Sequence, residues 1–229
     1  MKIPKLFVPE KDLEGEVKRL LEKEINPSDV QLKYSKFEVI HASTYAEGIA
    51  KLKEQSRKPF TFSENIEARI ADYEANGKDA ELFKTFLDSV TGIAYKAHST
   101  KFKLILRSDR LENIPQDFNQ GFITINYNTE LGIEFDSKKG KYNKALTREE
   151  AKNHEFWLAA MGNDEGKLVE YVDIWFDKRR VKEGMGVYLR ENTSQDELRA
   201  VVLNYGDFSS YTNGSSNLGG FARFVSDAQ

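Results

Sequence analysis

Cysteine is absent from this chain of 229 residues, and histidine occurs only three times. Without a thiol the chain has no disulfide framework, no cysteine nucleophile and no cysteine-ligated zinc or iron–sulfur centre. The three histidines, His41, His98 and His154, lie far apart in the sequence, and none has a partner at the spacing of a metal site. Thiol chemistry is therefore excluded, and histidine-based metal chemistry has no sequence signal.

The chain also lacks long apolar runs. None approaches the roughly 18 residues that a membrane span requires, and the first residues, Met1 to Val8, do not form a signal peptide. Lysine and arginine number 34 against 37 aspartate and glutamate, which gives a net charge of −3. This balance argues against a protein whose main task is to coat nucleic acid or an anionic membrane. We expect a soluble protein of the cytoplasm with no membrane partner.

Cofactor and nucleophile motifs are missing too. Neither GxGxxG nor GxxxxGK[ST] occurs, and there is no GxSxG nucleophile elbow. We therefore expect no bound cofactor. Hydrophobic residues make up 39% of the chain and aromatic residues 12%, which is enough for a substantial core. The length suits one large domain or two small ones. We predict a single domain over residues 1–229, with a soft boundary near residues 137–146.

The stretch from residue 61 to residue 107 is the most informative part of the sequence. Thr61 and Glu64 form a capping-box pair, with Ser63 as a competing N-cap residue. The helix that follows should stop at Gly77, because glycine adopts the left-handed conformation without steric cost. These signals predict one amphipathic helix between Thr61 and Gly77.

A second helix is predicted over residues 79–90, because its apolar residues form a broad stripe. A β-hairpin should follow over residues 92–107, since apolar and polar residues alternate there. Such alternation is typical of strands with one buried face and one solvated face. The residues predicted to face the core are Ile93, Tyr95, Ala97, Phe102, Leu104 and Leu106.

Similar patterns predict the remaining elements. Capping pairs at Thr44–Glu47 and Thr147–Glu150 open two more helices. The predicted helices cover residues 10–25, 44–55, 147–161 and 167–177, and the predicted strands cover residues 30–40, 121–128, 131–136, 184–190, 197–205 and 221–225. Strands and helices do not alternate one for one. We therefore predict an α+β fold with a mixed, largely antiparallel sheet and amphipathic helices packed mainly on one face. A doubly wound parallel sheet is the alternative.

The solvated face of the hairpin is rich in basic residues. It is interpreted either as an ordinary wet face or as a surface for an anionic ligand or nucleic acid. A glycine-, serine- and asparagine-rich loop over residues 206–220 adds an aromatic side chain beside it. The candidate binding residues are Lys96, His98, Lys101, Lys103, Arg107 and Tyr211. The leading hypothesis is a non-catalytic binding or assembly module, with self-association as a further form of partnership.

A catalytic alternative comes from a short acidic strand. Glu134, Asp136 and Lys138 alternate along residues 134–138, so they share one face, where two carboxylates could hold a divalent metal ion. The Asp136–Lys138 segment resembles the D/E-x-K element of restriction-endonuclease-like nucleases, and Asp117 lies upstream where that family carries a Pro-Asp pair. One residue separates Pro115 from Asp117, which departs from the pattern. The resemblance implies a metal-dependent phosphodiesterase, so whether the chain is an enzyme stays open.

Overall fold

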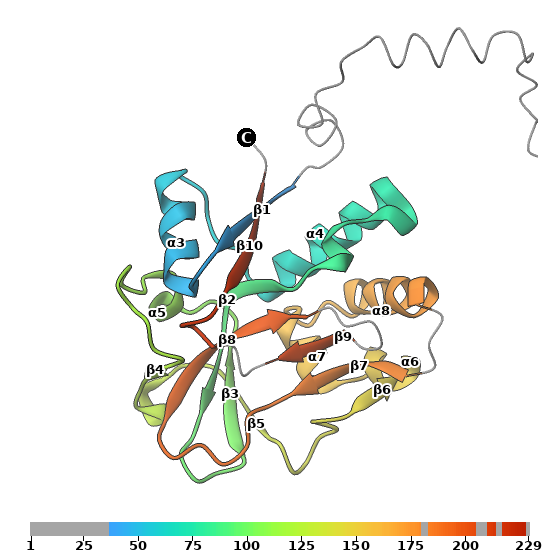
Figure 1. The fold of residues 1–229 in the computed structure, drawn as a ribbon. Helices are drawn as coiled ribbons and strands as arrows, with labels where there is room; N and C mark the ends of the chain where they lie inside the picture. Colours follow the sequence, from blue (N-terminus) through green and yellow to red (C-terminus); the bar gives the residue numbers. More distant parts are fainter. Residues whose placement is uncertain (1–36, 180–182, 205–209, 214–216, 228–229) are drawn as a thin grey trace, which may run out of the picture. The chain divides into compact units, whose positions relative to one another are not determined.

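A computed structural model of the chain describes residues 37–179, 183–204, 210–213 and 217–227. The predicted helix over residues 10–25 lies outside these residues, as does the part of the predicted strand over residues 30–40 that precedes residue 37, while residues 37–40 form a strand as predicted. The described part contains a two-stranded sheet and an eight-stranded sheet with helices around them (Figure 1). In the same residues, no helix combines the length and apolar character that crossing a bilayer requires.

The strands are β1 (Phe37–Ala42), β2 (Leu87–Tyr95), β3 (Lys101–Ile105), β4 (Ile123–Thr124), β5 (Ile133–Asp136), β6 (Ala145–Thr147), β7 (Glu183–Tyr188), β8 (Glu197–Leu203), β9 (Ser210–Asn213) and β10 (Ala222–Asp227). The α-helices are α3 (Tyr45–Glu54), α4 (Phe62–Asn76), α5 (Asp109–Glu112), α6 (Arg148–Lys152), α7 (Glu155–Ala160) and α8 (Glu165–Arg179). Short 3-10 turns are η1 (Gly77–Asp79), η2 (Leu82–Lys84) and η3 (Tyr127–Thr129).

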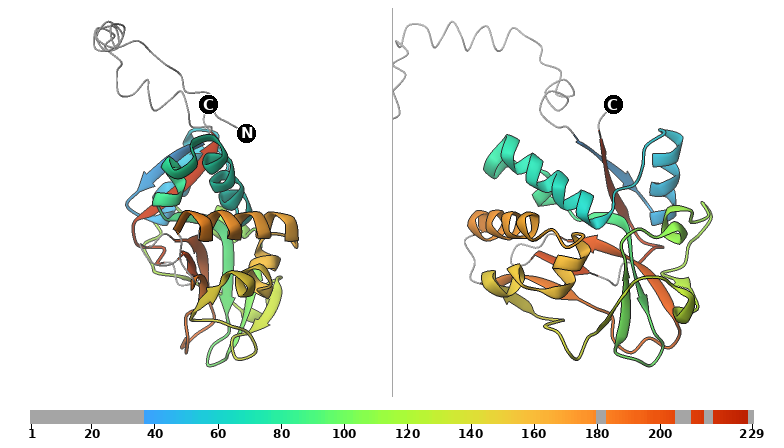
Figure 2. Two further views of the ribbon diagram at one scale, coloured as in Figure 1. Left: turned by 90° about the vertical axis from the view of Figure 1, so that its right-hand side faces the viewer. Right: turned by 180° about the vertical axis from the view of Figure 1, so that it is seen from behind.

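The larger sheet has the strand order β5-β3-β2-β8-β9-β7-β6, and β4 pairs with β8 outside this path. Neighbouring strands are antiparallel except β7 and β9, which are parallel. Strands β1 and β10 form a separate antiparallel ribbon. This ribbon and the turn of the β2–β3 hairpin lie at opposite ends of the described part (Figure 2). The predicted α+β class, with its mixed and largely antiparallel sheet, is confirmed.

Capping residues start three of the helices as predicted. Thr61 accepts a hydrogen bond from the main-chain N–H of Glu64 at the start of α4, and the Glu64 carboxylate accepts one from the Thr61 N–H. The same reciprocal pair opens α6 at Thr147. Helix α4 ends at Gly77, whose φ of +58° is the left-handed value that only glycine adopts cheaply. These bonds satisfy main-chain donors that a helix start leaves free.

The predicted helix over residues 79–90 is wrong. The chain makes the short turns η1 and η2 there, and strand β2 begins at Leu87. Leu82 and Phe83 are buried as expected, but they reach the core from a turn. The apolar spacing did not distinguish a buried turn and strand from a buried helix, an ambiguity typical of short apolar runs.

The hairpin itself is confirmed, with β2 and β3 paired from Gly92–Ile105 to Tyr95–Phe102. The expected wet face of its first strand is not there, because all nine residues of β2 are buried. Strand β2 lies between β3 and β8 and is covered on both faces, which buries its polar residues Asp88, Ser89 and Thr91 as well as its apolar ones. In the second strand Phe102 and Leu104 face the core, whereas Leu106 lies past the strand end and is 41% exposed.

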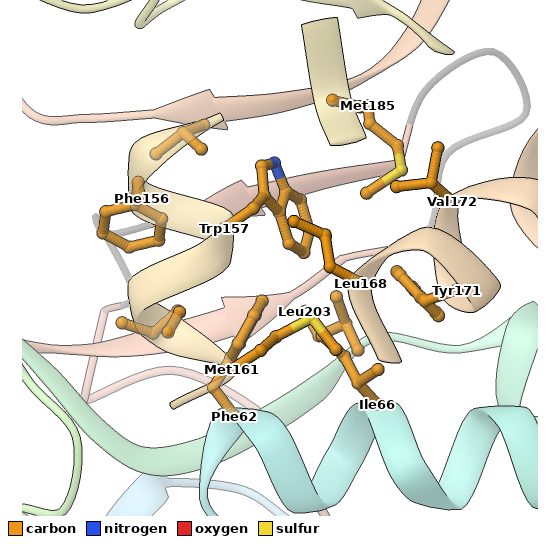
Figure 3. Packing of buried hydrophobic residues seen from close by; sticks show 14 of the residues in the cluster. Phe62, Ile66, Phe156, Trp157, Met161, Leu168, Tyr171, Val172, Met185 and Leu203 are labelled. Carbon is orange, nitrogen blue, oxygen red and sulfur yellow. The ribbon is translucent and has the colours of Figure 1, made fainter. Parts of the chain in front are cut away.

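One hydrophobic cluster fills the space between the sheet and helices α4, α6, α7 and α8. Trp157 of α7 is fully buried at its centre, with its ring 5.3 Å from Phe62 of α4 and 6.2 Å from Tyr171 of α8 (Figure 3). Met185 of β7 approaches the same ring from the sheet side (Figure 3). Large aromatic side chains from three helices and the sheet thus meet in one core.

A second cluster covers the other face of β2 and β8. It joins these strands to α3, α5 and the β1–β10 ribbon, and Ile49, Leu198 and Phe224 are among its buried members. Among the described residues, four α-helices therefore pack on one face and two on the other, which agrees with the predicted placement mainly on one side.

Two other predicted segments are subdivided. Helix 147–161 breaks at residues 153–154 into α6 and α7. The predicted loop over residues 206–220 contains β9, which pairs in parallel with β7 and antiparallel with β8. The main-chain groups of Tyr211 are part of β9, while its side chain lies outside the described residues. A strand of four residues in polar sequence gives no periodic signal, so only the neighbouring strands reveal it.

Candidate functional site

The basic residues of the hairpin are closely tied to the segment between β3 and β5. The Lys103 ammonium donates hydrogen bonds to the carbonyls of Tyr127 at 3.0 Å and Glu130 at 2.8 Å, and it lies 4.5 Å from the centre of the Tyr127 ring. Lys96 lies 5.8 Å from the same ring. Lys103 therefore anchors the chain that crosses this sheet face.

Acidic partners compensate the neighbouring cations. Lys101 pairs with Glu134 at 2.8 Å, and Arg107 pairs with Glu112 at 2.7 Å. We call Lys96, Lys101, Lys103 and Arg107 the basic row. Within it, Lys101 and Arg107 have carboxylate partners. A surface that binds a nucleic-acid backbone needs lysine and arginine side chains that are free to neutralise phosphates, without carboxylate partners of their own. The binding role of these residues stays a prediction.

His98 occupies the turn of the hairpin. Its φ is +51°, and its main-chain N–H donates to the carbonyl of Thr193 at 3.0 Å. Beside it, the Asp196 carboxylate accepts hydrogen bonds from the N–H groups of Ala97 and Tyr127, at 2.8 and 2.9 Å. These bonds lower the pKa of Asp196, because they stabilise the charged form. The turn is therefore held against the loop between β7 and β8.

The acidic residues of β5 are also engaged. Glu134 accepts hydrogen bonds from Lys101 and from the Tyr127 hydroxyl at 3.0 Å, which lower the pKa of its carboxyl group. Asp136 accepts from Thr100 and the main-chain N–H of Lys138, with the same effect on its pKa.

The remaining member of the predicted nuclease set, Asp117, is exposed in the connection between α5 and β4. Among the residues that the structure describes, no group of three or more histidine, aspartate or glutamate side chains is arranged to hold a metal ion. No observation therefore favours the nuclease, which stays an untested prediction.

A pocket of about 250 Å³ opens next to the hairpin turn. Its buried, apolar part comes from Tyr95 of β2, Phe102 of β3 and Leu189 after β7. Hairpin residues 99–101, residues 137–138 after β5 and residues 190–192 after β7 supply the polar rim. An apolar base with a few polar groups is the usual composition of a small-ligand site.

Cations outnumber anions at the rim of this pocket. Lys101, Lys138 and Arg190 line it, together with the single carboxylate of Glu191. Lys101 shares its charge with Glu134, and Arg190 lies 3.5 Å from the buried Glu197, which also pairs with Arg199. The Lys138 ammonium has no carboxylate within ion-pair distance in the described part of the chain. Of the side chains that line the pocket, three are therefore cationic and one is anionic, and Lys138 is the cation without a carboxylate partner in the described residues.

Asn143 and Tyr95 fix the loop that carries Arg190 and Glu191. The Asn143 side chain accepts from the Leu189 N–H at 2.6 Å and donates to the Glu191 carboxylate at 2.7 Å. The buried Tyr95 hydroxyl accepts from the Arg190 N–H at 3.2 Å. Burial raises the pKa of Tyr95, so its hydroxyl stays neutral. The rim is thus preorganised.

The sequence identified part of this site. Lys101 and Lys138 were candidates for different roles, and the structure places both at the pocket beside the His98 turn. Tyr95 was predicted only as a core residue. Arg190, Glu191 and Asn192 were missed, and the polar loop after β7 gave their only signal. Asn192 has a φ of +55°, which asparagine tolerates better than most residues.

Comparisons with known proteins identify a similar fold but do not assign the chain to a family. No family model matches the chain, and no curated protein matches it. A solved structure described as "Accommodation of massive sequence variation in Nanoarchaeota by the C-type lectin fold" is similar, with a TM-score of 0.64 and 14% sequence identity. The match covers 86% of this chain and 99% of that one. At this identity the likeness shows the fold alone: the chain is similar to proteins with the C-type lectin fold.

Proposed function

We propose that this chain is a non-catalytic binding module, and that its pocket beside the hairpin turn takes the anionic group of a small ligand. The observation that carries the proposal is the lining of one pocket by Lys101, Lys138 and Arg190 above an apolar base. A carboxylate or phosphate would meet the cations, and an apolar part of the ligand would rest on Tyr95 and Phe102.

The fold supports a binding role. The similar structure is described as a C-type lectin fold that accommodates massive sequence variation. In this chain the two hydrophobic clusters hold the sheet, while the pocket rim consists of three connecting segments. Side chains on connections can change with little cost to the core, which suits a binding site built on a rigid scaffold.

The ion pairs of the basic row favour a compact anion over a nucleic acid. Lys101 and Arg107 already have carboxylate partners, and Lys103 is held by carbonyls. Binding a nucleic-acid backbone draws on many free cations along a path. A single anionic group needs only the rim of the pocket.

Chemical-shift perturbation of the ¹⁵N-labelled chain tests the proposal. Phenyl phosphate and benzoate are the probes, and benzyl alcohol is the neutral control of similar shape. We expect saturable shifts at residues 95–102, 137–138 and 189–192 with an anionic probe, weakened by salt. Benzyl alcohol should give none.

The variants remove positive charge at different places, two charges at the pocket and one away from it. Lys138→Gln combined with Arg190→Gln should weaken anion binding at least tenfold. Lys84→Gln removes an exposed lysine that does not line the pocket, and it should leave the affinity unchanged. Equal binding by the double variant and the parent chain would disprove the proposed site.

A further inference from the structure

Exposed apolar side chains gather at one edge of the large sheet. Strand β5 ends the strand order on that side within the described residues. Leu131 is 88% exposed, Leu106 41% and Ile133 39%, and these are three of the five large hydrophobic residues exposed in the described part. Single exposed apolar residues are ordinary, but a contiguous group marks an interaction surface.

The strand register shows that these three residues are neighbours. Strands β3 and β5 pair Lys101 with Asp136 and Leu104 with Ile133. Continued past the ends of β3 and β5, the same antiparallel register would set Leu131 opposite Leu106. The approach of Gly132 to β3 agrees with this extension, because a Cβ on Gly132 would lie 2.6 Å from the Leu104 carbonyl oxygen.

Successive residues of a strand point to opposite faces. Ile133 and Phe135 therefore share one face of β5, with Leu131 in line with them just before the strand, and Glu134 and Asp136 share the other face. The edge thus offers three things to an incoming chain: an apolar face, an acidic face and the outward main-chain groups of an edge strand.

We propose that the β5 edge binds an extended peptide segment of a partner protein, in which apolar residues alternate with lysine or arginine. The mode is strand addition, with main-chain hydrogen bonds for affinity and alternate side chains for specificity. Its apolar residues, Leu106, Leu131 and Ile133, do not line the pocket beside the hairpin turn.

Strand β3 shows what the two faces of β5 accept. Its lysines lie opposite carboxylates, with Lys101 across from Asp136 and Lys103 across from Glu134. Its apolar residues lie opposite apolar ones, and the stacked rings of Phe102 and Phe135 are 5.4 Å apart. A strand added on the free side of β5 would meet the same alternation of faces.

Charge argues against a second copy of β5 as the occupant. Residues 131–136 contain two carboxylates and no cation. Glu134 already pairs with Lys101, whereas Asp136 has no ion-pair partner in the described part. Two copies of this edge would therefore bring two uncompensated aspartates together, which is destabilising. A segment with lysine or arginine at alternate positions supplies a counter-charge for Asp136.

Fluorescence anisotropy with a labelled peptide tests the proposal. The probe is the heptapeptide KFKLILR, the sequence of residues 101–107, because this is the strand that the fold already pairs with β5. We expect saturable binding to the full chain. Leu131→Asp should weaken it at least tenfold, since a charge would enter the apolar face of the edge.

Val169→Asp is the matched control, because Val169 of α8 is also 39% exposed but lies on a helix away from this edge. It should leave the affinity unchanged. A peptide with proline at its fourth position lacks a main-chain donor and should bind at least tenfold more weakly.

Equal affinity of Leu131→Asp and the parent chain would overturn the proposal, as would equal affinity of the proline peptide. Light scattering on a size-exclusion column supplies the remaining readout. A dimer that Leu131→Asp dissociates would show that the occupant is a second copy and would also overturn the proposal.

Discussion

His154 is a buried imidazole, 5% exposed, at the start of α7. Its Nε2 lies 3.0 Å from the Lys141 carbonyl, which fixes this nitrogen as the donor in the neutral ring. Its Nδ1 has no hydrogen-bond partner in the described part of the chain. Burial lowers the pKa of His154, and the bond to the Lys141 carbonyl opposes part of this effect.

The lowered pKa makes stability depend on pH. The unfolded chain takes up a proton near pH 6.5, whereas the folded chain resists protonation to lower pH. The stabilisation by neutral His154 is therefore complete above about pH 6.5 and is lost as the pH falls toward the folded pKa. We predict that His154→Gln flattens the fall in unfolding free energy below pH 6.5, measured by urea denaturation at several pH values.

His98→Asn is the control for this prediction, because His98 is exposed in a turn and asparagine tolerates its positive φ. It should keep the slope of the parent chain. A His154→Gln variant with an unchanged slope would show that other groups cause the acid sensitivity.

Arg69 is the second residue whose environment only the fold explains. Its guanidinium is fully buried and donates to the Tyr171 hydroxyl and to the carbonyls of Thr85 and Leu203. It also lies 5.5 Å from the ring of Phe83. One side chain thus ties α4 to α8, to β8 and to the turn before β2. In the sequence it is an arginine within an amphipathic helix pattern.

At the scale of elements, the helix starts are the most predictable features. A capping box is a local interaction between residues three apart, so it needs nothing from the rest of the chain. The sequence offered both Thr61 and Ser63 as N-cap residues for α4, and the structure assigns the role to Thr61. Ser63 lies inside the first turn of the helix.

Substitutions at these two positions should therefore differ. We predict that Thr61→Ala lowers the free energy of unfolding by about 1 kcal/mol, since it removes the acceptor for the Glu64 N–H. Ser63→Ala should change it by less than about 0.5 kcal/mol. Guanidinium denaturation of both variants measures the difference, and a larger loss in Ser63→Ala would contradict the assignment.

Sequence patterns misassigned elements that other parts of the chain cover on both faces. Strand β2 was split between a predicted helix and a predicted half-solvated strand, because its mixed apolar and polar residues have no clear period. The helix predicted over residues 147–161 is interrupted at residues 153–154, and both resulting short helices bury aromatic or small side chains in the same cluster.

At the scale of the molecule, two hydrophobic clusters share strands β2 and β8. Both tryptophans of the chain, Trp157 and Trp175, belong to the cluster of α4, α7 and α8. Tryptophan fluorescence therefore reports on one side of the sheet only. Helix α3 and its buried Ile49 belong to the other side.

This division allows a test of the predicted single domain. If the shared strands couple the clusters, a cavity on one side should destabilise both. We predict that Ile49→Ala lowers the unfolding free energy by about 2–5 kcal/mol and shifts the tryptophan fluorescence and circular-dichroism midpoints together. Separate midpoints would show that the two sides unfold independently.

The candidate site was predictable only in part for the same reason. Lys101 and Lys138 could be named from strand patterns, because alternation places a side chain on a face. The pocket depends on three connections that meet at the hairpin turn, and long-range pairs such as Asn143 with Glu191 hold them there. A sequence pattern over a few neighbouring residues cannot predict contacts between segments that are distant in the chain.

The sequence by itself determined the α+β class, the helix starts, the β2–β3 hairpin and the absence of thiol chemistry, because each depends on composition or on residues a few positions apart. The tertiary structure decided that β2 is buried on both faces, that acidic partners compensate the basic row, and that β9 pairs between β7 and β8. These features arise from contacts between distant segments, and their free energy appears only when the chain is folded.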